Sequence, residues 1–527
     1  MKEREHRNYE QDKLDLQLQN LPEERQQEEP NDKKISRRES VGKTKDDRKK
    51  KNRKERARAK QKKKTDKELA RVTYLFVTLF LVMIGYLVYF NVVKSKDIIN
   101  SPYNVRQDLL AKRVVRGKIL DQQGNVLART IVNEDGSETR EYPYGEIFSH
   151  VVGYSEKGKA GIELKQNFSM LTSNAFFLEK IANEMKEQKN IGDNIVTTLN
   201  TELQEAAYNA LGNNKGAAIV MEASTGKILA MVSKPGFNPN YISENWDALN
   251  NDPDSSLYNR ATMGQYAPGS TFKIVTALEY MRENPDFDNF AFDCQGEITE
   301  DGTTIHCFDN TYHGPENLSD AFANSCNSAF SSIGLTLNNS KWKETTKDLL
   351  FNSKLPSPLP YKSSSFQLEK RAEAGKVMMT AIGQGDTLVS PYHMALITSA
   401  IANGGILMKP YVVDQIANYT GTTVKKYMPE KYGELMTAQE AAKLTEYMTA
   451  VVDHGTGTSL SGEGYTVAGK TGTAEVSIDK KLVHSWFVGF SNIENPDIVV
   501  SVVIENADTD RITGTSVAKQ IFNEYYY

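Results

Sequence analysis

An uninterrupted apolar run from Val72 to Val93 constrains this chain more than any other feature. Its 22 residues, VTYLFVTLFLVMIGYLVYFNVV, include no charged side chain. A helix of this length is about 33 Å long, which matches the roughly 30 Å hydrocarbon core of a membrane. A cleaved signal peptide has a shorter apolar core followed by a small-x-small cleavage site, and neither is found here. The run predicts a transmembrane signal anchor over residues 72–93.

Charged residues divide unequally around this run. Residues 1–71 contain 25 Lys and Arg against 16 Asp and Glu, a net charge of +9. The whole chain carries −4, so residues 72–527 carry −13. Cytoplasmic flanks of membrane spans are enriched in Lys and Arg, which predicts a cytoplasmic N-terminus and places everything after Lys94 outside.

The basic segment itself has two interpretations. A Lys/Arg run can bind nucleic acid, but one that directly precedes a membrane span orients that span and attracts anionic lipid. We therefore expect no nucleic-acid partner. The segment has few aromatic or branched apolar side chains with which to bury surface, so residues 1–71 are predicted to form a disordered tail.

The part after the span divides into two regions. Residues 97–192 contain short alternating segments such as KILDQQGNVLAR, which predict a small β-rich pedestal. Residues 195–527 are long enough for one large domain. There GAAIVMEASTGKILAMVS predicts a β-hairpin, and TVAGKTGTAEV, HSWFVGF and DIVVSVVIEN predict three more strands, with helical patterns between and after them. This order predicts a mixed α/β domain with an antiparallel sheet flanked by helices.

Ser270 and Lys273, in YAPGSTFKIVTALEY, form the first of three chemical motifs. Ser-x-x-Lys is weak by itself, because it occurs six times in this chain. Only at Ser270 does a Pro-Gly pair precede the serine and an apolar helical pattern follow it, which places the hydroxyl in the first turn of a helix. Residues three apart share a helix face, so the Lys273 amine is predicted to reach the Ser270 hydroxyl.

Two further motifs follow in a fixed order. The second is Ser325-Cys326-Asn327, and the third, on a strand-like segment, is Lys470-Thr471-Gly472-Thr473. Each is weak alone, since a turn and an edge-strand lysine would explain them equally well. Ser-x-x-Lys, then Ser-x-Asn about 55 residues later, then Lys-Thr-Gly about 145 residues further on is a specific combination.

In this order the three motifs resemble those of penicillin-binding proteins. The similarity extends over everything after residue 72 and includes NVRQDLLAKRVVRGKILDQQGNVLA, GEIFSHVVGYSEKGKAGIE and AIGQGDTLVSPYHMA. These segments resemble the monofunctional class B type, in which a short pedestal precedes the transpeptidase domain. The resemblance implies a serine β-lactamase/transpeptidase-like fold. Only about 100 residues separate the span from the catalytic domain, too few for the glycosyltransferase of class A.

The resemblance implies a role for each motif residue in acylation. Ser270 would attack the penultimate D-Ala carbonyl of a D-Ala-D-Ala stem, with Lys273 as its base. That role requires a pKa below the ordinary lysine value of about 10.4, which burial and the like charge of Lys470 would both favour. Ser325 would relay the proton to the leaving amine. The backbone N–H groups of Ser270 and Thr473 would form the oxyanion hole.

The same resemblance implies a substrate-binding role for the remaining residues. Asn327 would hydrogen-bond a backbone amide of the donor peptide. Lys470, Thr471 and Thr473 would hold the terminal carboxylate of the donor or of a β-lactam. Gly472 would leave room for substrate to lie against the strand edge.

The chain has three cysteines, and none is assigned chemistry. Cys294 and Cys307 lie near His306 and His313, but their spacing matches no common zinc pattern, so no metal and no cofactor are expected. A Cys294–Cys307 disulfide and free thiols remain open, because the region is predicted to lie outside the membrane. Cys326 lies between two motif residues and is predicted to be a packing residue.

Taken together, the resemblance implies a membrane-anchored D,D-transpeptidase of peptidoglycan synthesis that β-lactams acylate. Two other interpretations use the same residues. A D,D-carboxypeptidase or serine β-lactamase would pass the acyl group to water, and a penicillin sensor or scaffold would not turn over at all. The anchor and pedestal favour a wall synthase. A membrane partner that polymerises glycan, of the SEDS type, is expected because the chain has no glycosyltransferase segment.

Overall fold

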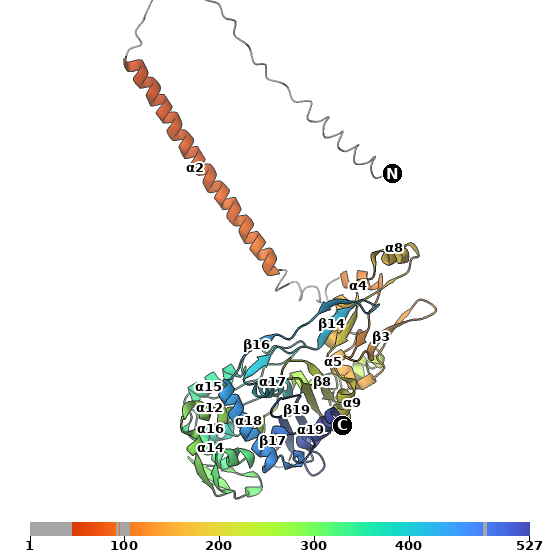
Figure 1. Ribbon diagram of the computed structural model, residues 1–527, viewed down its shortest axis with the longest axis vertical. Coiled ribbons are helices and arrows are strands. Elements are labelled where there is room, and N and C mark those ends of the chain that lie inside the picture. The colour runs from red at the N-terminus through yellow and green to blue at the C-terminus, as the bar shows by residue number, and fades with distance from the viewer. Residues whose placement is uncertain (1–44, 91–93, 95–105, 478–481) are drawn as a thin grey trace, which may run out of the picture. The chain divides into compact units, whose positions relative to one another are not determined.

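The computed structural model describes residues 45–90, 94, 106–477 and 482–527. The chain divides into two compact units, of which the first ends at Phe90 and the second begins at Asn91. The first contains the long helix α2 (Lys45–Tyr89), and the second contains every other described helix and strand (Figure 1).

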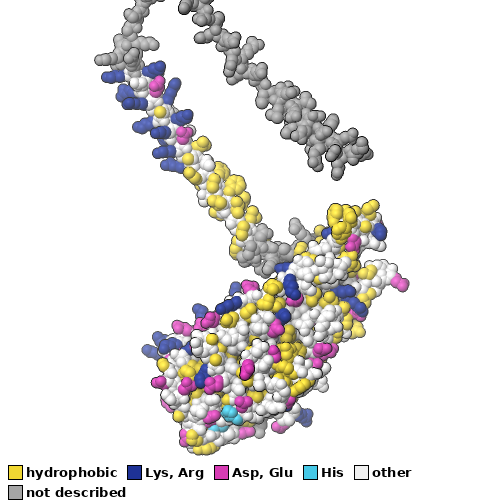
Figure 2. All heavy atoms as spheres, viewed as in Figure 1, with side chains coloured by type: hydrophobic (Ala, Val, Ile, Leu, Met, Phe, Trp, Pro, Cys, Tyr) yellow, Lys and Arg dark blue, Asp and Glu magenta, His cyan; other side chains and the backbone are white. Residues whose placement is uncertain are grey.

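Helix α2 joins a basic and an apolar segment. Lys and Arg side chains cover its N-terminal part, and apolar side chains cover its C-terminal part (Figure 2). Among the described residues it is the one helix long and apolar enough to cross a membrane. It contains most of the predicted anchor, of which residues 91–93 lie outside the described part of the chain.

Residues 45–71 are helical, so the prediction of a disordered tail is wrong for this segment. The segment is rich in Lys, Arg, Glu, Gln and Ala, all strong helix formers. Because the apolar segment already supplies a helix to extend, the basic segment needs no nucleus of its own. Residues 1–44 of the predicted tail lie outside the described residues.

The pedestal consists of short strands and short helices. Its strands are β1 (Val114–Val115), β2 (Ile119–Leu120), β3 (Val126–Val132), β4 (Glu138–Glu141), β5 (Asn190–Ile191) and β6 (Asn194–Thr197). Its helices are α4 (Arg106–Ala111), η2 (Gly145–Phe148), α5 (Ser149–Val152), α6 (Gly161–Lys165), α7 (Asn167–Met170) and α8 (Phe177–Met185). The prediction of a β-rich pedestal missed most of these helices, because elements this short show little periodicity.

The pedestal sheet also includes two strands from far along the chain. β14 (Val413–Ala417) and β15 (Thr423–Lys426) extend it in the order β15-β14-β6-β2-β3-β4. β14 pairs antiparallel with β6, with Ile416 opposite Ile195. The predicted boundary between residues 192 and 195 therefore does not separate the two regions fully, because this pairing joins distant segments and has no local sequence signal.

The large domain is built on a five-stranded antiparallel sheet, as predicted. Its order is β17-β18-β19-β7-β8, which leaves β17 at an edge. The strands are β7 (Gly216–Met221), β8 (Ile228–Lys234), β17 (Val467–Ser477), β18 (Leu482–Ser491) and β19 (Val499–Ala507). The predicted hairpin is the β7–β8 pair.

Both faces of this sheet are buried. In β7, Ala217, Ile219 and Met221 belong to one hydrophobic cluster, and Ala218 and Val220 to another. The helices α9 (Thr201–Ala210) and α19 (Gly514–Tyr526) pack together on one face (Figure 1). The helices α11 (Arg260–Met263) and α17 (Pro391–Ala402) contact β7, and α17 also contacts β18 and β19. Because successive strand residues point to opposite faces, both clusters form around one sheet.

A mainly helical region adjoins the edge strand β17. Its helices are η4 (Gly269–Phe272), α12 (Lys273–Glu283), η5 (Phe287–Asn289), η6 (Phe308–Asn310), α13 (Leu318–Ala323), α14 (Asn327–Thr336), α15 (Asn339–Asp348), α16 (Ala374–Ala381), α18 (Ala438–Asp453) and η7 (Thr458–Leu460). Its short strands are β9 (Ala291–Cys294), β10 (Glu297–Glu300), β11 (Thr303–His306) and β12 (Gly314–Asn317). The other described elements are η3 (Pro239–Tyr241), α10 (Trp246–Asn250), β13 (Ile406–Met408) and β16 (Lys431–Glu434).

Candidate active site

The helical turn η4 places Ser270 beside the edge strand. Gly269 has a φ of +53°, and its N–H donates to the Gly383 carbonyl at 2.9 Å. A Cβ at Gly269 would lie 2.5 Å from the Thr473 oxygen, so the backbone of η4 is pressed against β17. Only glycine combines a left-handed conformation with so close an approach. The first and third motifs are therefore in direct contact.

The second motif comprises two residues of the turn after α13, Ser325 and Cys326, and the first residue of α14, Asn327. Ser325 has a φ of +58°, a left-handed conformation that is uncommon for a residue with a side chain. The Lys273 amine donates to the Ser325 carbonyl at 2.6 Å, to the Ser325 hydroxyl at 3.2 Å and to Asn327 Oδ1 at 2.8 Å. One buried amine thus joins the first motif to both polar residues of the second.

Lys470 lies on β17 and is fully buried. Its amine donates to the Thr471 carbonyl at 3.2 Å and lies 5.6 Å from the centre of the Phe322 ring. A Cβ at Gly472 would lie 2.9 Å from Thr271 Cγ2 and 3.1 Å from Trp486 Cβ. The packing of η4 on β17 therefore already requires glycine at Gly472. The sequence interpretation explained this glycine differently, as leaving room for substrate.

Burial changes the protonation of both lysines. It lowers the pKa of Lys273 to about 8. It also lowers the pKa of Lys470 well below its ordinary value, and the positive charge of Lys273 lowers it further. Desolvation disfavours the charged form of any amine, and a second amine nearby adds repulsion. The predicted low pKa of Lys273 is thus explained by burial, while the repulsion acts on Lys470.

Ser270 lies in the helical turn η4, and Lys273 begins the helix α12 that follows it. The predicted contact between the Lys273 amine and the Ser270 hydroxyl is not among the hydrogen bonds of the amine in the described part of the chain. Within the described residues the amine bonds to Ser325 and Asn327, and no hydrogen bond joins it to Ser270. The amine is therefore held by the second motif. Catalytic hydrogen bonds are often long before substrate binds.

Thr456 is a site residue that the sequence did not indicate. Its hydroxyl lies 2.5 Å from the Thr471 hydroxyl. The adjacent Gly455 packs against α13, where a Cβ would lie 2.3 Å from the Ala323 oxygen. The contact depends on how α18 and the segment after it pack on β17, so no local pattern could have revealed it.

The three cysteines come together with His313 beside the second motif. Cys294 Sγ and Cys307 Sγ are 3.7 Å apart, too far for a disulfide, whose sulfur atoms are about 2.05 Å apart. Hydrogen bonds from Cys326 and Ser328 lower the pKa of the Cys307 thiol well below its usual range. The predicted packing role of Cys326 is therefore incomplete, because these side chains form a group that could hold a metal ion.

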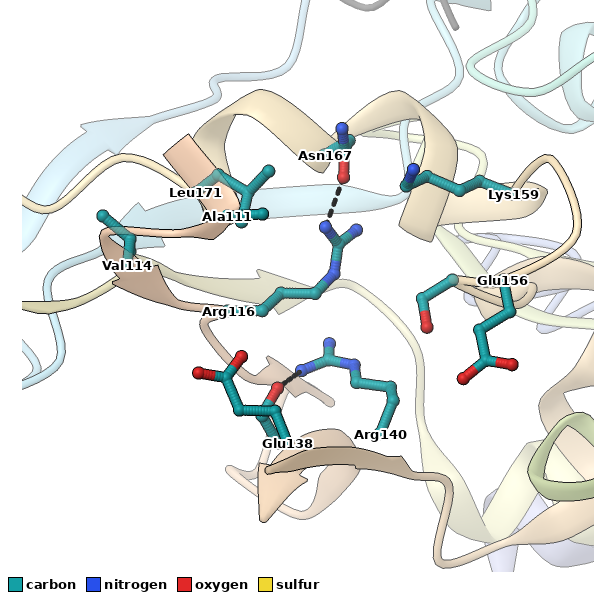
Figure 3. Close-up of a pocket in the computed structure, with 11 residues that line it drawn as sticks. Ala111, Val114, Arg116, Glu138, Arg140, Glu156, Lys159, Asn167 and Leu171 are labelled. Carbon is teal, nitrogen blue, oxygen red and sulfur yellow. Dashed lines mark hydrogen bonds between the residues drawn. The ribbon is translucent and has the colours of Figure 1, made fainter. Parts of the chain in front are cut away.

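A cavity of about 230 Å³ lies in the pedestal, away from all three motifs. Arg116 and Arg140 line it, and Arg116 points toward Asn167 (Figure 3). Both guanidinium groups form salt bridges with the buried carboxylate of Glu163, and that of Arg140 measures 2.8 Å. Because the charged groups pair with one another, this cluster is a structural feature of the pedestal.

Two family models match the chain. The penicillin binding protein transpeptidase domain matches residues 216–527, and the penicillin binding protein A dimerisation domain matches residues 116–195. Among curated relatives, the peptidoglycan D,D-transpeptidase PbpA of Mycolicibacterium smegmatis is 30% identical over 444 residues, which cover 79% of this chain and 90% of that protein. Stage V sporulation protein D of Bacillus subtilis is 29% identical over 435 residues, 77% of this chain and 64% of that protein.

Solved structures show the same similarity. Penicillin-binding protein A from M. tuberculosis, as its ceftriaxone acyl-enzyme complex, has a TM-score of 0.72 and 27% identity over 79% of this chain and 100% of that chain. The D,D-transpeptidase domain of a peptidoglycan glycosyltransferase from Eggerthella lenta has a TM-score of 0.69 and 32% identity over 78% of this chain and 98% of that chain. The mixed α/β architecture of the large domain is thus shared with proteins of this group.

Proposed function

We propose that this chain, which belongs to the penicillin-binding protein transpeptidase family, is a serine D,D-transpeptidase that cross-links peptidoglycan stem peptides and that β-lactams acylate. The observation that carries the proposal is Lys273, a fully buried amine with a pKa near 8 that bonds to both polar residues of the second motif. A lysine in this state is partly neutral at physiological pH, so it can accept a proton.

Acylation begins at Ser270. Its oxygen attacks the carbonyl carbon of the penultimate D-Ala, and its proton passes to the neutral Lys273 amine. The tetrahedral oxyanion is stabilised by the N–H groups of Ser270 and Thr473. The close contact of Gly269 with the Thr473 carbonyl supports this pairing, because it brings the two backbone segments together. When the bond to the terminal D-Ala breaks, the proton returns through the Ser325 hydroxyl to the leaving amine.

The position of β17 at a sheet edge supports a binding mode for the donor peptide. An extended peptide can pair with an exposed strand edge, and nearby side chains then select its termini. Lys470, Thr471 and Thr473 hold the donor carboxylate, and Asn327 forms a hydrogen bond with a backbone amide of the donor. Thr471 already has a hydroxyl partner in Thr456, which restricts its orientation. In the second half-reaction a stem-peptide amine attacks the acyl carbon and releases Ser270.

The helix α2 supports a membrane-anchored form of the enzyme. We infer a single pass with a cytoplasmic N-terminus, because basic residues precede the apolar segment. Residues 1–71 then form the cytoplasmic tail, 72–93 the span, 97–192 the pedestal and 195–527 the transpeptidase domain, with β14 and β15 completing the pedestal sheet. A SEDS-type glycan polymerase is the proposed membrane partner, since the two matched domains, residues 116–195 and 216–527, correspond to a dimerisation domain and a transpeptidase domain.

The decisive experiment follows acylation and cross-linking in the full chain. Wild type is expected to form a persistent adduct with labelled penicillin and to cross-link glycan made from lipid II by an added polymerase. Ser270→Ala is expected to do neither, whereas Ser516→Ala, in another Ser-x-x-Lys match on α19, is expected to do both. An adduct that disappears within seconds would indicate a β-lactamase, and absence of wild-type cross-links with an active polymerase would contradict the proposal.

A further inference from the structure

Four potential metal ligands meet at one point beside the second motif. The sulfur atoms of Cys294, Cys307 and Cys326 and Nδ1 of His313 all lie within 4.8 Å of one another. Cys294 Sγ lies 3.7 Å from Cys307 Sγ and 3.4 Å from His313 Nδ1. Cys307 Sγ lies 3.8 Å from Cys326 Sγ. A tetrahedral zinc site with Zn–S bonds of about 2.3 Å places its sulfur atoms about 3.8 Å apart.

The surroundings of these atoms suit a bound cation. All three cysteines are buried, with exposures of 0% for Cys294, 3% for Cys307 and 0% for Cys326. The Gly296 N–H points at Cys294 Sγ and the Ala329 N–H at Cys326 Sγ, each at 3.4 Å. Hydrogen bonds from backbone N–H groups stabilise metal-bound thiolates and fix their orientation. A cluster of thiols without a metal would gain little from donors aimed at its sulfur atoms.

The ligands come from four separate segments. Cys294 ends β9, Cys307 follows β11, His313 precedes β12, and Cys326 is the N-cap of α14. Zinc sites are recognised in a sequence by pairs of ligands a few residues apart, and these four ligands do not form such pairs. The sequence therefore predicted no metal.

We propose that Cys294, Cys307, His313 and Cys326 bind one zinc ion in a closed tetrahedral site. Four protein ligands leave no open position, so the ion has a structural role and activates no water. Three thiolates and one imidazole are the soft donor set that zinc prefers over magnesium or calcium. This part of the inference depends only on the ligand geometry and is independent of the proposed transpeptidase activity.

The site also has a positioning role that rests on the proposed function. Cys326 lies between Ser325 and Asn327, both of which bond to the Lys273 amine. Asn327 Nδ2 donates to the carbonyl of His306, the residue before Cys307, at 2.9 Å. A zinc ion would therefore fix both ends of the second motif against the β9–β12 region. Cys326 acts through its neighbours and is a positioning residue for them.

Metal content of the full chain tests the site. After purification under reducing conditions without chelator, wild type is expected to contain one zinc per chain. Cys294→Ser and His313→Ala are expected to lose most of it, while His306→Ala is expected to keep it. His306 is the matched control because it neighbours Cys307 but is exposed and faces Glu297. Wild type without stoichiometric zinc, or with a Cys294–Cys307 disulfide in its place, would overturn the proposal.

A second measurement uses wild type alone, so it does not depend on how the variants fold. Replacement of the metal by Co²⁺ is expected to produce thiolate-to-cobalt charge-transfer absorption, which added Zn²⁺ removes. Chelation is expected to slow acylation by labelled penicillin on the order of 10- to 100-fold, since misplacing a catalytic group by about 1 Å costs that much. Return of Zn²⁺ should restore the rate. Absence of the charge-transfer band would refute thiolate ligation, and an unchanged acylation rate after verified metal loss would refute the positioning role.

Discussion

Two groups of buried charged side chains lie in different regions of the molecule. They differ in whether they combine opposite charges or like charges. In the pedestal, the Glu163 carboxylate is fully buried and pairs with both Arg116 and Arg140. In the candidate active site, Lys273 and Lys470 are fully buried, and neither forms a salt bridge with a carboxylate of the described residues. One group combines opposite charges, and the other brings two like charges together.

The two compositions have opposite effects on protonation. Burial alone would raise the pKa of Glu163, but the two guanidinium groups lower it below its ordinary value. Burial lowers the pKa of Lys273 to about 8, and the negative charge of the Glu316 carboxylate opposes that shift only in part. A balanced group stays ionised and stabilises the fold, whereas an unbalanced one contains a base that can change protonation near neutral pH.

Substitution of Lys273 tests the group of like charges, and we expect it to have the largest effect on acylation. Lys273→Met should slow acylation by labelled penicillin by about 10³-fold, since general-base catalysis contributes roughly 10²- to 10⁴-fold. The melting temperature should change little, because removal of a buried charge offsets the loss of the amine's hydrogen bonds to Ser325 and Asn327. Lys376→Met, a half-buried control on α16, should acylate normally. A normal acylation rate in Lys273→Met would assign the proton transfer to another group.

Substitution of Glu163 in the pedestal group should lower stability and leave the acylation rate unchanged. Glu163→Gln leaves two buried guanidinium groups without their anion, so the free energy of unfolding should fall by about 3 to 5 kcal/mol. Urea titration followed by intrinsic fluorescence measures this loss. Acylation per folded molecule should stay at the wild-type rate, because the cluster lies away from all three motifs. A large fall in acylation with unchanged stability would mean that the pedestal cluster acts in the reaction.

The pH dependence of acylation should follow the Lys273 amine. Only the neutral amine accepts the serine proton, so the rate should rise with pH and level off above about 8, the lowered pKa of Lys273. Below pH 7 the rate should fall about tenfold per pH unit, because the neutral fraction falls by that factor. Stopped-flow acylation between pH 6 and 9 measures the profile. A flat profile would contradict the assignment of Lys273 as the base.

The smallest expected effect concerns the hydroxyl pair at the edge of the site. Thr456→Val removes the partner of the Thr471 hydroxyl while keeping a side chain of similar shape. One hydrogen bond is worth about 1 kcal/mol, so acylation efficiency should fall roughly fivefold. Thr458→Val, two residues further along in η7, provides a control. An effect as large as that of Lys273→Met would mean that Thr456 contacts the substrate directly.

The elements predicted correctly from the sequence share a local origin. Alternation within GAAIVMEASTGKILAMVS corresponds to the β7–β8 pair, and the Pro-Gly pair before Ser270 marks the start of η4 and α12. The apolar run forms the C-terminal part of α2. Each pattern depends on residues a few positions apart, so backbone geometry and side-chain periodicity are enough to read it.

The sequence by itself determined the motif order, the apolar span, the charge asymmetry and the main strands. Only the tertiary structure decided that β14 joins the pedestal sheet, that Lys273 bonds to Ser325 and Asn327, and that three cysteines meet His313. These contacts join segments that are distant along the chain. Their geometry follows from how helices and sheets pack, and no local pattern encodes that packing. The candidate site residues can therefore be read from the sequence, whereas their hydrogen bonds and burial cannot.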